Sequence, residues 1–121
     1  MTDETGTRDR AAQAIAAQND RFRASLGRDP GVPGRIVLTA GVEVRGPAFV
    51  ESAIQAVQRF QDFTEDNDPH GERDFGVFEI EDEKLFWKID LYDLAYRYGS
   101  ETPADPARTR RVLTLMLAHE Y

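Results

Sequence analysis

A β-hairpin is the local structure that this sequence specifies most strongly. Two runs, Asp74–Ile80 and Lys84–Tyr92, are rich in aromatic and β-branched residues and alternate in polarity, which is typical of strands that bury one face. The apolar side chains of the second run share one face: Leu85, Trp87, Ile89 and Leu91. Because only the charged segment 81–83 separates the runs, we expect them to pair antiparallel with this face in the core.

Two helices and a further strand are predicted on the N-terminal side of the hairpin. An amphipathic run at Asp9–Leu26 predicts a surface helix, and the proline- and glycine-rich segment 28–34 predicts a connector. The short β-branched run Arg35–Ala40 predicts a strand. A second helix is expected at Pro47–Gln61, because proline is well suited to the first turn of a helix.

The C-terminal part is expected to add a short edge strand within residues 93–100 and a last helix at Ala107–Glu120. Asp105 is a candidate N-cap of that helix and Pro106 its first-turn proline. Three arginines gather in its first turns, where the helix dipole disfavours cations. We therefore expect acidic groups from residues 62–105 to lie beside these arginines: Arg108, Arg110 and Arg111.

Together these elements predict an α+β fold, a single small domain in which an antiparallel sheet of three to four strands packs against two to three helices. Residues 1–34 are expected to form an N-terminal helix and connector, and residues 35–121 a compact α+β domain. The chain has 121 residues and no cysteine, which excludes a disulfide framework and a cysteine-based zinc site. No run approaches the roughly 20 apolar residues needed to cross a bilayer, so we expect a soluble, cytoplasmic protein without a membrane partner.

Negative charge is concentrated in one part of the chain. The formal net charge is −7, but residues 62–105 alone carry fourteen acidic and four basic residues, a net charge of −10. A surface of this kind repels phosphate backbones and attracts cations or basic protein surfaces. We therefore expect no direct binding of nucleic acid through this segment.

The acidic loop before the hairpin resembles a metal site only in part. Asp66, Asp68, His70 and Gly71 match the first half of a calcium loop, but the twelfth position, which needs a bidentate glutamate, is Val77. The same loop offers a transition metal several carboxylates and one imidazole, and whether it binds a metal stays open. The simpler interpretation is a polar loop in which the side chains of residues 66–68 bond to the loop's own backbone.

Signals for an enzyme are weak. The sequence contains no cysteine, no serine within a Gly-x-Ser-x-Gly turn and no phosphate-binding glycine loop. Asp90 lies on one strand face with Lys88, and an ion pair with Lys88, His70 or an arginine of the last helix explains its position more simply than general-base catalysis. No catalytic residue and no cofactor is predicted.

Three blocks carry a family resemblance: NDPHGERDFG (67–76), LFWKIDLYD (85–93) and DPARTRRVLTLMLAHEY (105–121). Over about residues 35–121 the chain resembles domain of unknown function family 3768, short proteins of bacterial plasmids and other mobile elements. The resemblance implies no catalytic residues. It implies a gene neighbourhood, because relatives tend to travel with anti-restriction and plasmid-maintenance genes.

We derive three functional hypotheses. The first is an acidic binding protein that inhibits a host defence complex, in anti-CRISPR or anti-restriction form, by contacting a basic surface of a protein or nucleoprotein or by mimicking nucleic acid. The second is a small metal-dependent enzyme that uses the 66–74 loop and Asp90, and the third is a plasmid-maintenance protein that forms a homodimer through the hairpin edge. The residues predicted to contact a partner are Asp66, Asp68, His70, Glu72, Asp74, Glu79, Glu81, Asp82 and Glu83.

Overall fold

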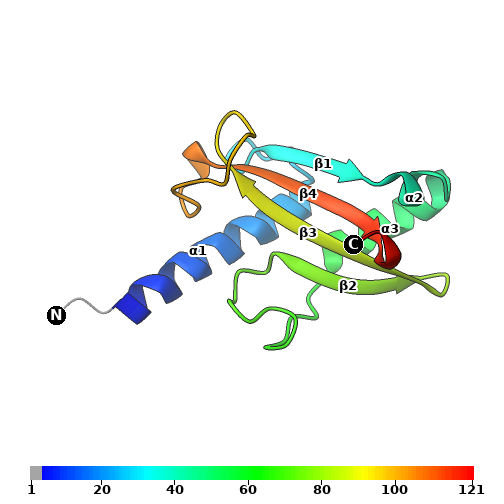
Figure 1. Ribbon diagram of the computed structural model, residues 1–121, viewed down its shortest axis with the longest axis horizontal. Coiled ribbons are helices and arrows are strands. Elements are labelled where there is room, and N and C mark those ends of the chain that lie inside the picture. Colours follow the sequence, from blue (N-terminus) through cyan, green and yellow to red (C-terminus); the bar gives the residue numbers. More distant parts are fainter. Residues whose placement is uncertain (1–3) are drawn as a thin grey trace.

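A four-stranded sheet with helices on one of its faces forms the framework of the computed structural model, which describes residues 4–121 (Figure 1). The strands are β1 (Gly34–Leu38), β2 (Phe75–Ile80), β3 (Glu83–Tyr92) and β4 (Arg110–Leu117). The helices are α1 (Glu4–Ser25), α2 (Ala40–Glu43) and α3 (Pro47–Arg59), with short 3-10 turns η1 (Pro106–Arg108) and η2 (Ala118–Glu120). The predicted α+β class is confirmed.

The sheet has the strand order β1-β4-β3-β2. Strand β3 pairs antiparallel with both β2 and β4, whereas β1 runs parallel to β4, so the sheet is mixed. Helices α1 and α3 lie on the same face of it (Figure 1). The buried cluster between them and the sheet includes Phe22, Phe49, Leu85, Trp87 and Leu113.

The predicted helix at Ala107–Glu120 is wrong, because most of this segment is the central strand β4. Asp105 and Pro106 do start a helical turn, and an Asp105 carboxylate oxygen accepts a hydrogen bond from the Ala107 N–H at 3.0 Å, but the turn ends at Arg108. From residue 110 onward the side chains alternate, and the inward-facing set is buried: Arg111, Leu113, Leu115 and Leu117. Pairing with β1 on one side and β3 on the other satisfies the backbone that a helix would have satisfied internally.

The first helix is longer than predicted and packs against the rest of the chain. It begins at Glu4, so of the predicted N-terminal region 1–34 only residues 1–3 lie outside the described part. Phe22 on α1 and Val32 in the connector are fully buried in the same core as the sheet. The division at residue 34 stays a prediction, while the structure places α1 in direct contact with α3.

The predicted hairpin is confirmed as β2 and β3, with Gly76 directly opposite Trp87. The indole of Trp87 is fully buried, and its edge lies against the position where any side chain at residue 76 would project. The edge strand predicted within residues 93–100 does not form. Gly99 makes an isolated bridge with Tyr92, and the rest of this segment is a loop.

The C-terminal end of the chain is fastened by Glu120. Its carboxylate accepts hydrogen bonds from the Thr39 hydroxyl at 2.6 Å, the Gly41 N–H at 3.0 Å and the Leu117 N–H at 2.9 Å. The bonds from Thr39 and Leu117 are the main causes that lower the pKa of Glu120. This carboxylate therefore joins the end of β4 to the start of α2.

Within residues 4–121, none of the helices has the length and apolar character needed to cross a membrane.

Gly76→Ala tests the packing of the hairpin on the core. A Cβ at this position would meet the Trp87 indole and lie 2.8 Å from the Phe60 ring. We expect overpacking to destabilise the fold by about 1–3 kcal/mol, measured as a lower urea midpoint. Gly99→Ala is the control, because the nearest atom to its added Cβ is 4.0 Å away. Equal urea midpoints for the two variants would contradict the packing described here.

Candidate functional site

The residues predicted to contact a partner form two groups at opposite ends of β2, which is an edge strand. Loop 61–74 precedes β2 and the turn 81–82 follows it (Figure 1). Because β2 has six residues, the two groups are separated by roughly 20 Å at about 3.3 Å per residue. We call the following carboxylates the acidic edge: Asp62, Glu65, Asp66, Asp68, Glu72, Asp74, Glu79, Glu81, Asp82 and Glu83.

Two members of the acidic edge, Asp62 and Glu65, were missed by the sequence-based selection. Both side chains are exposed. The charge imbalance of residues 62–105 already included them, and that signal would have found them. His70, which was selected, is exposed in the same loop.

Loop 61–74 is held first by its own side chains. The Asn67 side-chain oxygen accepts a hydrogen bond from the Thr64 N–H at 2.8 Å, and its amide donates to the Asp62 carbonyl at 2.9 Å. An Asp68 carboxylate oxygen accepts from the Arg73 N–H at 3.0 Å. The predicted polar loop that satisfies its own backbone is thus confirmed for Asn67 and Asp68.

Helix α1 fastens the end of the same loop. The side-chain amide of Asn19, which is fully buried, donates to the Glu72 carbonyl at 2.9 Å. The neighbouring Asp20 accepts from the Arg73 guanidinium at 2.8 Å. The loop therefore joins β2 at a position that the N-terminal helix determines.

Aromatic side chains fix the start of the loop. The rings of Phe60 and Phe63 lie 5.0 Å apart, and both pack edge-on against Trp87, at 5.5 and 6.1 Å. The buried guanidinium of Arg23 lies over the Trp87 ring at 4.9 Å and donates to the carbonyls of Val57 and Phe60 at 2.8 and 2.9 Å. Because both ends of the loop are packed or bonded to the core, its carboxylates are displayed on a rigid support.

A second buried guanidinium, that of Arg111, positions α1 itself. It donates to the side-chain oxygen of Asn19 at 2.8 Å and to that of Gln18 at 2.9 Å. Gln18 in turn donates to the Ala104 carbonyl at 2.9 Å. Burial lowers the pKa of Arg111 to about 10, so the side chain remains charged at neutral pH.

Acidic groups were expected beside the three C-terminal arginines, and this is correct only for Arg108. Its guanidinium lies 3.9 Å from the Asp105 carboxylate. Arg110 donates to a backbone carbonyl, and among the described residues Arg111 has the amides of Gln18 and Asn19 as its side-chain partners. These amides come from α1, more than 90 residues away along the chain.

Few basic groups neutralise the acidic edge. Arg45 lies 2.9 Å from Glu83 and 3.8 Å from Glu81. Within residues 4–121, the other members of the acidic edge form no ion pair. Glu79 faces Lys84 across the hairpin without reaching salt-bridge distance. Most of the negative charge of the acidic edge is therefore not neutralised by an ion pair among the described residues.

Two carboxylates at the loop end are destabilised in their charged form. Burial is the main cause that raises the pKa of Glu72, followed by the charge of Asp74. Burial is likewise the main cause that raises the pKa of Asp74, and the charges of Asp68 and Asp90 add to it. Asp90 itself pairs with Lys88 at 2.7 Å, which confirms one of its three predicted partners.

The acidic loop does not assemble a metal site in this structure. Across residues 4–121, no three histidine, aspartate or glutamate side chains converge so that they could hold a metal ion. Asp66 and His70 are exposed, and Asp68 bonds to the loop backbone. The geometry therefore gives no support to the metal-dependent enzyme hypothesis.

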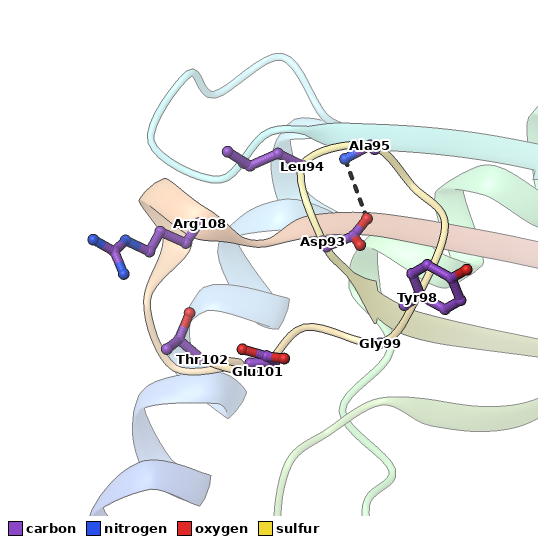
Figure 2. A pocket seen from close by; sticks show the side chains of 8 residues that line it. All are labelled: Asp93, Leu94, Ala95, Tyr98, Gly99, Glu101, Thr102 and Arg108. Carbon is purple, nitrogen blue, oxygen red and sulfur yellow. Dashed lines mark hydrogen bonds between the residues drawn. The ribbon is translucent and has the colours of Figure 1, made fainter.

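A surface cavity of about 580 Å³ lies where β3 ends and β4 begins, between the loop after β3 and η1 (Figure 2). Its lining includes the exposed side chains of Leu94 and Tyr98, together with Glu101 and Arg108. The Asp93 carboxylate is occupied by the backbone N–H groups of Ala95 and Arg97. The sequence analysis did not predict this cavity, and none of the acidic-edge residues lines it.

The comparisons with known proteins identify the family. The model of the family described as Protein of unknown function (DUF3768) matches residues 38–120. The chain belongs to this family. Neither a curated protein nor a solved structure shows a significant match to the chain.

The match to DUF3768 covers β2, β3, β4 and the whole acidic edge, but only the last residue of β1 and none of α1. It begins at Leu38, so Gln18, Asn19 and Asp20 lie outside it. In this DUF3768 protein, the α1 side chains that fasten the end of the acidic loop therefore come from a segment that the family model does not describe.

Asp74→Asn tests the electrostatic strain at the loop end. Because the folded-state pKa of Asp74 is raised, the protonated carboxyl favours folding below the ordinary value of 3.8, and this contribution is lost as pH rises through the folded-state pKa. A neutral amide removes the charged form, so we expect a higher melting temperature than wild type at pH 7 and a shrinking difference toward pH 3.

The matched control for this experiment is Asp66→Asn, which removes a charge from an exposed position of the same loop. We expect its melting temperature to differ little from that of the wild type across the same pH series. A lower melting temperature of Asp74→Asn at pH 7 would contradict the assignment of strain to this carboxylate.

Proposed function

We propose that this protein is a small, non-enzymatic binding protein whose acidic edge contacts a basic surface of a protein or nucleoprotein. We further propose that it acts in the cytoplasm and inhibits a host defence complex, as an anti-restriction or anti-CRISPR protein. The observation that carries this proposal is the acidic edge itself: two groups of carboxylates at the ends of an edge strand, of which the group in loop 61–74 is fastened to α1 and the core.

Rigid presentation supports binding over a purely solvating role. Solvated acidic segments usually stay mobile, whereas loop 61–74 is bonded to α1 through Glu72 and Arg73 and packed on the core through Phe60 and Phe63. A partner that meets a preorganised surface loses less conformational entropy on binding. The raised pKa values of Glu72 and Asp74 fit the same interpretation, because a cationic partner would relieve the strain that these two charges impose on the free protein.

The choice of target rests on charge and on family resemblance. Basic channels and clefts that hold nucleic acid are natural partners of a row of carboxylates, which can take the place of phosphates. The resemblance to the family implies that relatives travel with anti-restriction and plasmid-maintenance genes. Both lines of support favour a defence complex that itself handles DNA or RNA.

The proposal is tested by capture from the native host with the full-length protein as bait. We expect a basic protein or nucleoprotein to be retained at 0.1 M NaCl and released toward 1 M, because the Debye length falls from about 10 Å to about 3 Å. The test variant is Glu65→Lys/Asp66→Lys/Asp82→Lys, in which three exposed members of the acidic edge are reversed. We expect this variant to retain no partner.

A matched control carries the same change in net charge elsewhere. Glu43→Lys/Glu51→Lys/Glu101→Lys reverses three exposed acids outside the acidic edge, so both variants move the formal net charge from −7 to −1. The control is expected to keep binding and to protect incoming plasmid DNA from restriction or CRISPR interference in transformation assays. Protection by the test variant equal to that by the wild type would overturn the proposal.

A further inference from the structure

One side of the β2 backbone is not used by any other segment of residues 4–121. The Ile89 N–H donates to the Asp74 carbonyl at 2.8 Å, which places residue 74 in a hydrogen-bonded pair of the antiparallel ladder. Alternate residues therefore face β3, and the intervening residues Phe75, Val77 and Glu79 direct their N–H and C=O groups away from it. In the part of the chain that the structure covers, no other segment bonds to the backbone of these three residues.

An exposed edge of this kind is a template for another strand. Strand β2 is six residues long and contains no proline. Phe75 and Val77 are half-buried, and the Phe75 ring already packs on Phe86 and Tyr121 at 5.3 and 6.2 Å. Recognition at this edge therefore depends on backbone hydrogen bonds, with charge at both ends of the strand.

Charge determines which strand can pair there. Antiparallel pairing of two copies about Val77 would place the acidic loop of one copy beside the turn 81–82 of the other. Like charges would then meet at both ends, where Arg45 is the one base that pairs with the turn in the described chain. A second copy is disfavoured, whereas an extended segment with lysines or arginines meets carboxylates at both ends.

The opposite edge of the sheet does not offer the same combination. Strand β1 has five residues and carries the exposed Arg35, whose guanidinium stacks on the Tyr96 ring at 3.8 Å. No acidic residue lies within β1. A basic segment is therefore directed to β2.

We propose that the partner inserts an extended, lysine- or arginine-rich segment beside β2 as a fifth strand of the sheet. The backbone groups of Phe75, Val77 and Glu79 bond to this segment, and the two acidic groups hold its basic side chains. This inference rests on the proposed function and specifies how the same surface would recognise its partner.

The test uses the full-length protein and a synthetic peptide of alternating lysine and valine, KVKVKVK. Val77→Pro removes an N–H that the hairpin does not use, so the fold is expected to persist, whereas Val77→Thr keeps the N–H and serves as the control. We expect Val77→Pro to weaken peptide binding about tenfold, the effect of roughly one to two backbone hydrogen bonds, and Val77→Thr to bind as the wild type does.

A second measurement does not depend on the fold of the proline variant. The same peptide N-methylated at alternate residues keeps its charge but loses the N–H groups along one of its edges. When the methylated edge is the one that would pair with β2, we expect the wild-type protein to bind this peptide about tenfold more weakly. Amide hydrogen exchange at Val77 and Glu79 is expected to slow when the unmodified peptide binds.

Two outcomes would overturn the inference. Equal affinity for the methylated and unmodified peptides in both methylation registers, with unchanged exchange at Val77 and Glu79, would mean that charge alone holds the peptide. A wild-type protein that is dimeric in solution and becomes monomeric on Val77→Pro would assign the edge to a second copy.

A different result separates this inference from the proposed function. Slowed exchange and weaker binding of the methylated peptide, together with no protection in the transformation assay, would support strand addition and reject the defence-inhibitor proposal.

Discussion

A buried guanidinium, which has no carboxylate partner among the described residues, determines how the N-terminal helix meets the sheet. Burying a charge is costly unless hydrogen bonds replace its water, and Arg111 obtains two of them from Gln18 and Asn19. Asn19 also donates to the Glu72 carbonyl, so a single amide bonds to the central strand and to the acidic loop at once. Displacing α1 would break the hydrogen bonds to the Arg111 guanidinium and the hydrogen bond from Asn19 to the acidic loop. The positions of the helix and the loop therefore depend on each other.

The carboxylates of the acidic edge differ from those that stabilise the fold. Glu72 and Asp74 are held where burial and neighbouring carboxylates disfavour their charged forms. Glu120 shows the opposite arrangement, since its carboxylate is stabilised by three hydrogen bonds and serves the fold. Glu120 is thus satisfied within the chain, whereas most members of the acidic edge have no ion-pair partner among the described residues.

The polarity and turn patterns of short segments predicted those helices and strands that the segments themselves determine. The alternation around Trp87 was sufficient for the hairpin, and Pro47 for the start of α3. The C-terminal strand was not predicted, because Asp105 and Pro106 do begin a helical turn and a leucine-rich run is compatible with a helix or a strand. Pairing with β1 and β3 on its two sides determines that the segment is a strand. The charge of the sequence was sufficient to predict the carboxylates, but not their separation into two groups, which depends on the position of β2. The Arg111–Asn19 contact could not be predicted, because it joins residues 92 positions apart and no local sequence signal indicates it.

The single tryptophan gives the molecule a built-in optical reporter. Trp87 lies beneath Gly76 of the edge strand and against Phe60 and Phe63 at the base of the loop, and its indole N–H is buried without an acceptor in the described structure. Lifting either the strand or the loop would admit water to that N–H. The emission wavelength of Trp87 therefore distinguishes a ligand that binds without moving β2 or loop 61–74 from a ligand that displaces one of them.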